Sequence, residues 1–478
     1  MRINLPLHGV SERSAEITNQ RMLNMYLEVS QEGAKGEYAL IGVPGLTAFK
    51  TVGSGPIRAM AHDSHGSWFV ISAGQIYADV QDTPRLLGTV PASGTIHMVT
   101  NLDGEIAILV GSQLFIATVN DLTTVTDIDY PRDANHLIYQ DSRFILTRPN
   151  GEFYISAIDD GTSWAALDFA TAERHPDGLV GGLNADAQLL LFGEDSTEIW
   201  QNTGNATFPY ERNNQGDMEK GLKAASSVAK DGVHSIWLGP DGVFYSKEGR
   251  NAVRISNHDI EARIAKWSNI ENANAFIFNS QGHVFYAFSH PEGCVVFDAI
   301  TSRWHERQTY GQSRWRAACH LKFTGTDYVG DGTSNQIYSI DASAYAEGTD
   351  PLVTPTIGDE KKRLRISSVV LDIDSGVGLN TGQGEDPQVM MRYSDDAGRT
   401  WSQELWRTMG VMGAYEARPQ WNRLGQSRAR VYEFSISDPV KRVITGAYQE
   451  VIGAEVQAIS DKVDAILAAL RAAGLTTT

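Results

Sequence analysis

The chain has 478 residues, enough for two or three domains of ordinary size. Its 45 Gly, 17 Tyr, 16 Phe and 10 Trp, with only 21% charged residues, are typical of a turn-rich β protein and argue against disorder or a helical bundle. The net charge of −18 argues against a nucleic-acid-binding protein, and the basic run at residues 361–365 is too short to change that.

The sequence indicates neither a signal peptide nor a membrane span. Its first residues, MRINLPLHGVSER, lack a continuous apolar core, and no window approaches the about 18 apolar residues that a spanning helix needs. Cys294 and Cys319, too few for a disulfide framework or a four-cysteine zinc site, lie in apolar stretches that predict buried thiols. We expect a protein that folds in a reducing cytosol and inserts into no membrane.

From about residue 55 the sequence falls into units of roughly 35 to 50 residues, the spacing of propeller blades. In each unit an apolar strand leads through a polar turn to a second strand and then to a closing aromatic one; the turns read DSHG, LDG, QDS, NAD, KDG, SQG and TGT. Asp and Gly there supply the side-chain hydrogen bonds and positive φ that tight hairpins require. The pattern predicts an all-β fold with a seven-bladed β-propeller over residues 51–346, preceded by an N-terminal segment, residues 1–50, that leads into it.

The blade pattern stops at EGTDPLVTPTIGDEKK, a Pro-, Thr- and charge-rich connection typical of a domain boundary. Beyond it, alternating apolar and polar residues indicate five or more strands: ISSVVLDIDSG, DPQVMMRYSDDAGRTW, SQELWRTMG, EARPQWNRLGQSRARVYEFSIS and KRVITGAYQEV. Residues 347–452 are therefore predicted to form a small antiparallel β-sandwich.

Residues 453–478 are predicted to form a C-terminal amphipathic α-helix and tail. Apolar residues recur there at spacings of three and four, as in an a/d seam over two heptads: Val456, Ile459, Val463, Ile466 and Leu470. Either this helix packs in cis on its own sandwich, or it associates in trans with another copy. The sequence leaves both open, because a helix of this length is marginal by itself.

The stretch SDDAGRTW, residues 394–401, fits the Asp-box pattern of sialidase and glycosidase propellers. In that pattern the Asp accepts hydrogen bonds across a turn, the Gly permits the reversal and the Trp tucks beneath. We interpret Ser394, Asp396, Gly398 and Trp401 as a structural turn that staples a hairpin and performs no catalysis. SAIDDGTSW, residues 156–164, resembles the pattern loosely and is interpreted in the same way.

No assembled active site is recognisable. A sialidase needs three converging arginines, of which only Arg58 is suggestively placed, and other glycosidases need two carboxylates about 5 to 10 Å apart, a pair that cannot be singled out among 58 acids. Residues 62–65, HDSH, are more typical of a solvated turn than of a metal site. We predict no catalytic residue, metal or cofactor. The alternative is a glycan-binding or glycan-cleaving propeller, since exposed loop aromatics could bind sugars.

Residues 172–204, AERHPDGLVGGLNADAQLLLFGEDSTEIWQNTG, closely resemble the packaged-DNA stabilisation protein, or tail hub (nozzle), family of short-tailed bacteriophages, the podoviruses. The residues that carry the resemblance are Pro176, Asp177, Gly178, Phe192, Gly193, Thr197, Glu198, Trp200, Thr203 and Gly204. The early LPL with NQRMLNMYLE, the VPGL expected to open the first blade, and FYISAIDDGTSWAALDFATAE also resemble this family. The C-terminal heptad helix is a departure from it.

The resemblance implies a non-enzymatic structural protein of the virion tail, assembled in the host cytoplasm. It implies a ring of six copies below the dodecameric portal adaptor, which extends the DNA channel, retains packaged DNA together with a tail needle or plug, and anchors tailspikes or tail fibres. DNA would be only transient cargo. Six copies would carry six times −18, or −108, and an acidic wall would let DNA slide past.

Overall fold

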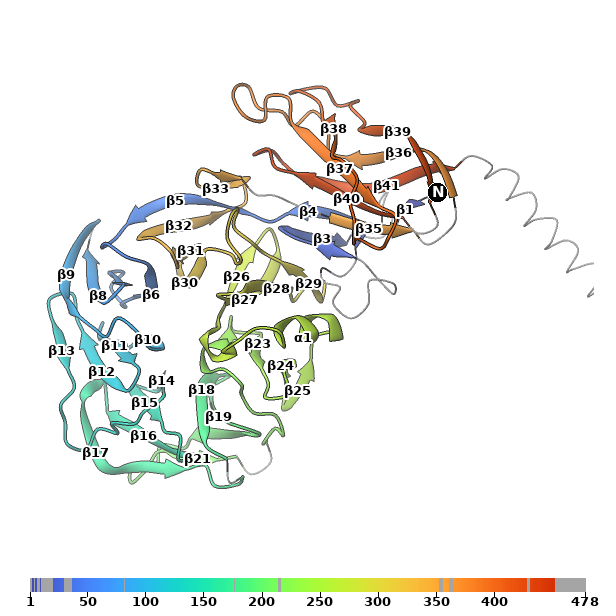
Figure 1. The fold of residues 1–478 in the computed structure, drawn as a ribbon. Helices are drawn as coiled ribbons and strands as arrows, with labels where there is room; N and C mark the ends of the chain where they lie inside the picture. The colour runs from blue at the N-terminus through green and yellow to red at the C-terminus, as the bar shows by residue number, and fades with distance from the viewer. Residues whose placement is uncertain are drawn as a thin grey trace, which may run out of the picture. The chain divides into compact units, whose positions relative to one another are not determined.

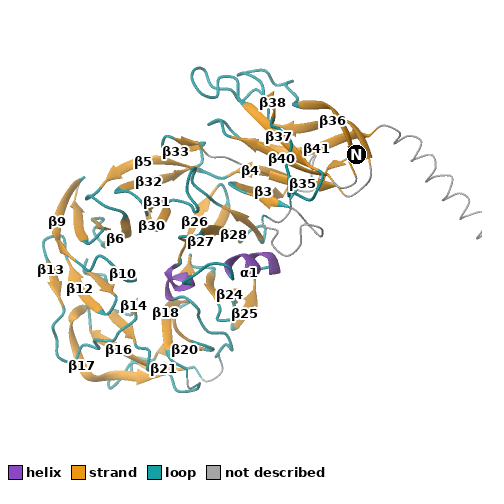
Figure 2. Cartoon of the chain, in the orientation of Figure 1, coloured by secondary structure: helices purple, strands orange, loops and turns teal. Residues whose placement is uncertain are grey.

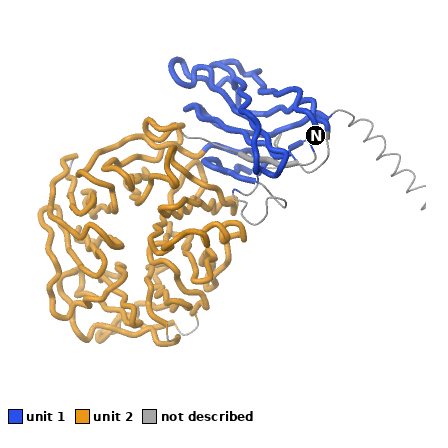
Figure 3. Tube along the Cα trace, viewed as in Figure 1, with its two compact units in different colours: residues 1–42, 353–478 blue, residues 43–352 orange. Residues whose placement is uncertain are grey.

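A computed structural model of the protein divides into two compact units (Figure 3). One unit comprises residues 43–352, and the other combines residues 1–42 with residues 353–478. Strands dominate, and the α-helix of the described part is α1 (His258–Ile264) (Figure 2). The structure describes residues 2–451 apart from residues 4, 7–8, 10–19, 30–36, 81, 176, 214–215, 352–355, 361–363 and 428–429.

Residues 43–352 form a β-propeller of seven antiparallel sheets (Figure 1). The first strand of each blade lies near the axis, where β6 contacts β10 on one side and β30, from the last blade, on the other. These first strands are β6 (Ile57–His62), β10 (Ile96–Thr100), β14 (His136–Gln140), β18 (Leu179–Ala185), β22 (Ala229–Lys230), β26 (Asn274–Ser280) and β30 (Ala317–Phe323). The predicted propeller with seven blades is confirmed.

The remaining strands follow in sequence from the axis outward in each blade. The second strands are β7 (Trp68–Ser72), β11 (Ile106–Val110), β15 (Arg143–Thr147), β19 (Gln188–Gly193), β23 (Ser235–Leu238), β27 (His283–His290) and β31 (Thr326–Asp331). The third strands are β8 (Gln75–Val80), β12 (Gln113–Ala117), β16 (Glu152–Ala157), β20 (Thr197–Asn202), β24 (Phe244–Glu248), β28 (Gly293–Asp298) and β32 (Gln336–Asp341). The fourth strands of the first six blades are β9 (Thr83–Thr89), β13 (Leu122–Thr124), β17 (Asp160–Thr171), β21 (Tyr210–Arg212), β25 (Asn251–Arg254) and β29 (Arg303–Glu306).

The hydrophobic core of the propeller lies between adjacent blades. Phe69 and Ile71 of the first blade share one cluster with Ile108 of the second, and comparable clusters join the blades that follow. The middle strands are covered on both faces, which explains their continuous apolar sequences: all five residues of β11, IAILV, are buried. Full burial of each Ile, Leu or Val side chain in such a strand contributes about 1.5–3 kcal/mol.

The turns between first and second strands have the backbone conformation that the sequence predicted. Each of the seven contains a residue at positive φ: Gly66, Gly104, Asp141, Asp186, Gly232, Gly282 and Gly325. Asp63, in the first of these turns, accepts hydrogen bonds from the backbone N–H groups of His65 at 2.9 Å and Ser67 at 2.7 Å. The repeated Asp and Gly positions therefore set the hairpin geometry blade by blade.

The seventh blade is closed by β5 (Gly45–Thr51), which comes from the opposite end of the propeller sequence. It pairs antiparallel with β32 from Gln336 opposite Thr51 to Asp341 opposite Gly45. The expectation that VPGL opens the first blade is therefore wrong, because this stretch leads into the outer strand of the last one. The pairing of β5 with β32 joins the two ends of the propeller sequence by main-chain hydrogen bonds, so opening the propeller requires breaking a β-ladder.

The other unit is a sandwich of two sheets. One sheet contains β3 (Met25–Val29), β4 (Tyr38–Gly42), β41 (Val443–Val451), β36 (Leu364–Ile373) and β39 (Gln420–Ser427), with β1 (Arg2–Ile3) also on β41. The second contains β2 (Arg21–Met22), β35 (Thr356–Glu360), β40 (Arg430–Ile436), β37 (Gln388–Ser394) and β38 (Leu405–Thr408). Their facing side chains form one core around Trp421, Tyr432 and Phe434.

The N-terminal segment differs from the expectation that residues 1–50 simply lead into the propeller. Residues 1–42 belong to the sandwich unit, where Leu40 pairs with Ile444 near the other end of the chain. The stretch expected to be only a connection also contributes β35 to the sandwich. These early strands carry the buried Met25 and Leu27, which complete the sandwich core. The heptad positions of the expected C-terminal helix lie outside the described residues.

A buried charged cluster fastens the two ends of the propeller sequence. The fully buried Arg307 lies with its Cζ 3.6 Å from the ring centroid of Trp315, and its Nη2 donates to the carbonyl oxygen of Pro44 at 2.6 Å. Glu347 lies 3.9 Å from Arg307 Nη2 and 3.4 Å from Arg316 Nε. Pro44 directly precedes β5 and Glu347 belongs to β33 (Ala346–Glu347), which pairs with β5 and with β34 (Asp350–Pro351). The cluster therefore holds the entry and the exit of the propeller together.

Replacing Glu347 with alanine should destabilise the propeller by about 3–5 kcal/mol, because the change removes the carboxylate nearest to a buried guanidinium. Urea unfolding followed by tryptophan fluorescence measures the effect. The matched control is Glu219→Ala, at an exposed position of the same unit, which should leave the unfolding midpoint nearly unchanged. Equal midpoints for the two variants would contradict the role of the cluster.

Candidate functional site

The Asp-box-like turn lies in the sandwich, directly after β37. Asp396 Oδ1 accepts hydrogen bonds from Ser394 Oγ at 2.7 Å and from the Thr400 backbone N–H at 2.8 Å, and its Oδ2 accepts one from Thr400 Oγ1 at 2.6 Å. The bonds from Thr400, followed by that from Ser394, hold the pKa of the Asp396 carboxyl well below its usual range. Gly398, at φ +86°, donates its N–H to Ser394 Oγ at 2.9 Å. Every polar group named here serves the turn itself.

The neighbouring charges of this turn are also paired within the sandwich. Arg392 stands over the Trp401 ring, with its Cζ 4.7 Å from the ring centroid. Asp395 accepts two hydrogen bonds from the buried Arg430, at 2.7 and 2.8 Å. A catalytic carboxylate must be available to a substrate, whereas both aspartates here are occupied by internal donors. The arrangement therefore supports a fold-stabilising turn.

The family-like segment, residues 177–204, contains the first three strands of the fourth blade. Asp177 accepts hydrogen bonds from the N–H groups of Asp195 at 2.9 Å and Ser196 at 3.0 Å, across the β19–β20 turn. A side chain at Gly193 would place its Cβ 2.3 Å from Asp177 Oδ2, and one at Gly178 would lie 2.2 Å from a backbone carbonyl oxygen. Glycine is therefore required at both positions, because Asp177 and the backbone carbonyl lie too close to leave room for a Cβ. Pro176, the first residue of this set, lies outside the described residues.

The remaining family-like residues pack or bond within the same blade. Glu198, 3% exposed, accepts hydrogen bonds from the Arg174 N–H at 2.8 Å and from Trp200 Nε1 at 3.0 Å. Thr197 Oγ1 donates to a backbone carbonyl at 2.7 Å, and Phe192 is fully buried. Thr203 and Gly204 lie in the loop after β20, where both backbone N–H groups are hydrogen-bonded. The set forms a local scaffold and no catalytic group.

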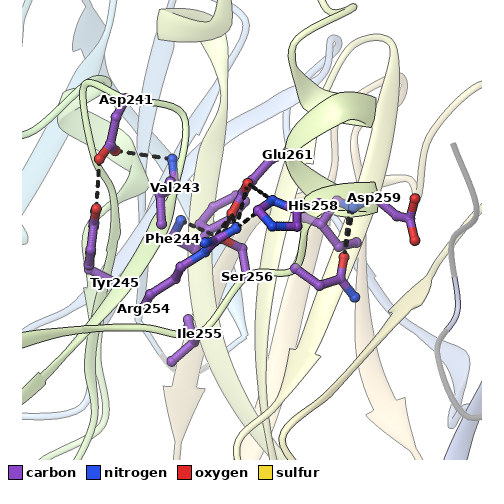
Figure 4. A network of polar contacts seen from close by, with 12 residues as sticks. Asp241, Val243, Phe244, Tyr245, Arg254, Ile255, Ser256, His258, Asp259 and Glu261 are labelled. Carbon is purple, nitrogen blue, oxygen red and sulfur yellow. Dashed lines mark hydrogen bonds and ion pairs between the residues drawn. The ribbon is translucent and has the colours of Figure 1, made fainter. Parts of the chain in front are cut away.

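Polar residues around α1 join the fifth blade to the following helix (Figure 4). Arg254 donates to both oxygens of Glu261, at 2.9 and 2.8 Å. Ser256 Oγ donates to Glu261 at 2.7 Å and accepts the N–H of Phe244 at 3.0 Å, while Asn257 caps the first turn of α1. The carboxylate and the guanidinium satisfy one another, so this network positions the helix.

The axis of the propeller contains two adjoining cavities of about 510 and 290 Å3. Arg58 lines both, but its guanidinium donates to the backbone carbonyls of Ala73, Pro91 and Gly94 at 2.7–3.0 Å. Arg314 lines the larger cavity, and a third arginine is absent from the described walls of both. The three-arginine carboxylate site of a sialidase is therefore not formed around Arg58, which instead binds neighbouring turns together.

A histidine pair lies in the wall of the smaller cavity. The ring centroids of His97 and His136 are 4.1 Å apart, and His97 Nε2 and His136 Nδ1 are buried without a hydrogen-bond partner in the described part of the chain. Burial lowers the pKa of His97 to about 4, and burial with repulsion from His97 lowers that of His136 well below its usual value. The sequence reasoning missed this pair, although IHMV and NHLIY place a histidine in the first strands of successive units.

The described residues form neither a metal-binding cluster nor a membrane-spanning helix. Within the described ranges, no group of three or more His, Cys, Asp or Glu side chains is arranged to hold a metal ion. Residues 63–65 lie in the β6–β7 turn, directly after His62, the last residue of β6. Among the same residues, no helix combines the length and the apolar character that crossing a membrane requires. Cys294 and Cys319 are buried free thiols, as predicted, and burial raises the pKa of each to about 12.

Two protein-family models match the chain, one for each kind of fold. The model described as "Bacteriophage P22 Gp10, beta-propeller" matches residues 1–345, and "Bacteriophage P22 Gp10, beta-sandwich" matches residues 351–451. No curated protein sequence matches the chain significantly. The two matches follow one another in the same order as the propeller and the main part of the sandwich.

Three solved structures are among those similar to this chain. The computationally designed Ika8 protein has 11% identity and a TM-score of 0.40, covering 62% of this chain and 99% of its own. BamB from Moraxella catarrhalis has 12% identity and a score of 0.39, covering 69% and 97%. The extracellular domain of BT4673 from B. thetaiotaomicron has 8% identity and a score of 0.44, covering 84% of this chain and 58% of its own. These scores are too low to carry an argument about function.

Replacing Asp396 with alanine should lower the melting temperature of the sandwich, because the turn loses the acceptor of three hydrogen bonds. The carboxyl pKa is depressed in the folded state, so this stabilisation is present above the ordinary pKa of about 3.9 and is lost as the pH falls through the lower folded value. Calorimetry at neutral pH measures the shift. Glu404→Ala, at an exposed position of the same unit, is the control. A melting temperature unchanged in both variants would contradict the role of the turn.

The propeller should lose stability as the pH falls from about 6.5 towards about 4. In this window the unfolded chain protonates His97 and His136, whereas the folded chain keeps them neutral because their pKa values are lowered. A His97→Gln variant should therefore show a smaller drop in melting temperature between neutral and mildly acidic pH. His65→Gln, at an exposed position, should retain the drop of the unaltered protein. Identical pH dependence in all three proteins would refute this account.

Proposed function

Because the chain belongs to the bacteriophage P22 Gp10 family, we propose that it forms the hub ring through which a phage tail holds and releases DNA. Because it belongs to this family, the protein is a structural component of a phage tail hub and therefore of the virion. The observation that carries the proposal is the pair of family matches, which together cover residues 1–345 and 351–451.

In the assembly that we propose, six copies form a ring below the portal adaptor. The ring extends the DNA channel, retains the packaged genome together with a tail needle or plug, and anchors tailspikes or tail fibres. Assembly takes place in the host cytoplasm. A propeller closed by β5 supports this role, because a ring without an open gap resists deformation better than a sheet with two free ends.

The charge of the chain also favours a passage for DNA over a DNA-binding surface. A net charge of −18 per copy repels phosphate, and a wall with few free cations does not capture a moving duplex. Several basic groups of the propeller are already paired with acids, among them Arg148 with Asp133 and Lys247 with Asp186. DNA is therefore proposed as transient cargo that contacts the channel without specific recognition.

Glycoside cleavage has less support than a structural role. The Asp-box-like turn that motivated it uses its carboxylates internally, and the family that matches is a structural one. An active glycosidase needs two carboxylates about 5 to 10 Å apart and open to a substrate. We therefore propose no enzymatic activity.

Electron microscopy of the full chain mixed with the portal adaptor of its phage tests the assembly. We expect rings of six copies attached to the adaptor, each copy contributing one propeller. The protein without adaptor is the control, because a hub can remain monomeric until the adaptor templates the ring. A folded protein that fails to bind the adaptor would overturn the hub proposal, whereas rings of another order would overturn only the number of copies.

A further inference from the structure

A small pocket lies at the seam between the seventh and first blades, where β5 closes the ring. Its volume is about 220 Å3. The residues that line it include Phe49, Lys50, Trp68, Asp79, Phe323 and Tyr328. They come from five strands of two blades, so the pocket exists only in the closed propeller.

Aromatic rings form much of the wall. The centroid of Phe49 lies 5.5 Å from that of Trp68 and 4.7 Å from that of Tyr328, and Phe323 packs edge-on against Trp68 at 5.4 Å. Phe49 remains 43% exposed. A cluster that was purely a core would bury this ring, so the exposed aromatic surface is available to a ligand with an apolar face.

An unsatisfied acceptor lies in the same wall. Asp79 is 6% exposed; its Oδ2 accepts a hydrogen bond from Lys50, whereas its Oδ1 is buried and has no partner within the described chain. A buried acceptor without a donor costs about 1–3 kcal/mol, and a ligand hydroxyl would remove that cost.

The charges of the pocket indicate a neutral ligand. Lys50 Nζ contacts both Asp79 and Asp82, at 2.6 Å from the latter, and stands 5.6 Å from the ring centroid of Phe49. An aromatic and acidic pocket attracts cations, but here the Lys50 ammonium group already occupies the place that a cationic ligand would take. An anion would meet two carboxylates against one ammonium group. The groups left for a ligand are the exposed aromatic surface of Phe49 and the unpaired acceptor Asp79 Oδ1.

We propose that this pocket binds a neutral saccharide unit. The C–H face of a sugar ring packs against Phe49 and Tyr328, and a sugar hydroxyl donates to Asp79 Oδ1. The volume is below the roughly 300–1,000 Å3 of sites for drug-sized ligands and accommodates a single ring. This goes beyond the structural role in the tail and is independent of the Asp-box-like turn, which belongs to the sandwich.

Saturation-transfer-difference NMR of the full chain tests the site. The probes are methyl α-glucoside, methyl α-galactoside, methyl α-rhamnoside and N-acetylglucosamine, each at millimolar concentration, with choline chloride as a separate cationic probe. We expect signals from the ring protons of at least one sugar and none from choline. Phe49→Ala should weaken the binding of that sugar about tenfold or more, because it removes the aromatic face. Asp79→Asn should weaken it to a similar degree, because Lys50 would hold the amide oxygen and the charged acceptor would be replaced by an NH2 group.

The matched control is Tyr310→Ala, which removes an aromatic side chain that is 62% exposed elsewhere on the propeller and should leave sugar binding unchanged. Phe49→Ala keeps the Lys50–Asp79 pair, so it tests the site even if Asp79→Asn destabilises the fold. The proposal is overturned if no sugar gives a signal, if choline alone binds, or if the signal survives in the folded Phe49→Ala protein. None of these outcomes affects ring formation with the adaptor, so the two proposals fail separately.

Discussion

Closure of the propeller by β5 is the constraint on which the rest of this unit depends. Seven blades bury their apolar faces only against one another, so a gap between the last and first blades would expose two of those faces at once. The ladder between β5 and β32 prevents such a gap by placing residue 51 opposite residue 336. Arg307 adds a side-chain fastening where β5 begins, through its bond to the Pro44 carbonyl.

The same closure explains why charge is buried at this end of the propeller. Arg307 contacts both ends of the propeller sequence, at Pro44 and at Glu347, and an apolar side chain could neither donate to the Pro44 carbonyl nor pair with the Glu347 carboxylate. Buried ion pairs add little net stability but strongly penalise arrangements that separate them. We interpret the cluster as a device that specifies which ends meet.

The residues that looked like catalytic or binding candidates in the sequence form hydrogen bonds within the fold instead. Asp396, Arg58 and Glu198 each combine with neighbouring donors or carbonyls, and none presents a free group to a substrate. Conversely, Phe49 and Asp79 belong to no motif, since Asp79 follows Phe49 by 30 positions in the sequence and Tyr328 comes from the far end of the propeller. A pattern in a single sequence predicts local turns well, but it does not predict which distant side chains come together in the fold.

The sequence by itself determined the all-β class, the seven blades and the positions of their turns, because hairpin geometry depends on local Asp and Gly residues and on period-two apolar strands. It also indicated the family through a segment of the fourth blade. Only the tertiary structure decided that VPGL closes the last blade, that residues 1–42 complete the sandwich, and that His97 faces His136. These features depend on pairing between distant segments, and a strand's sequence carries its burial and its turns but not the identity of its partner.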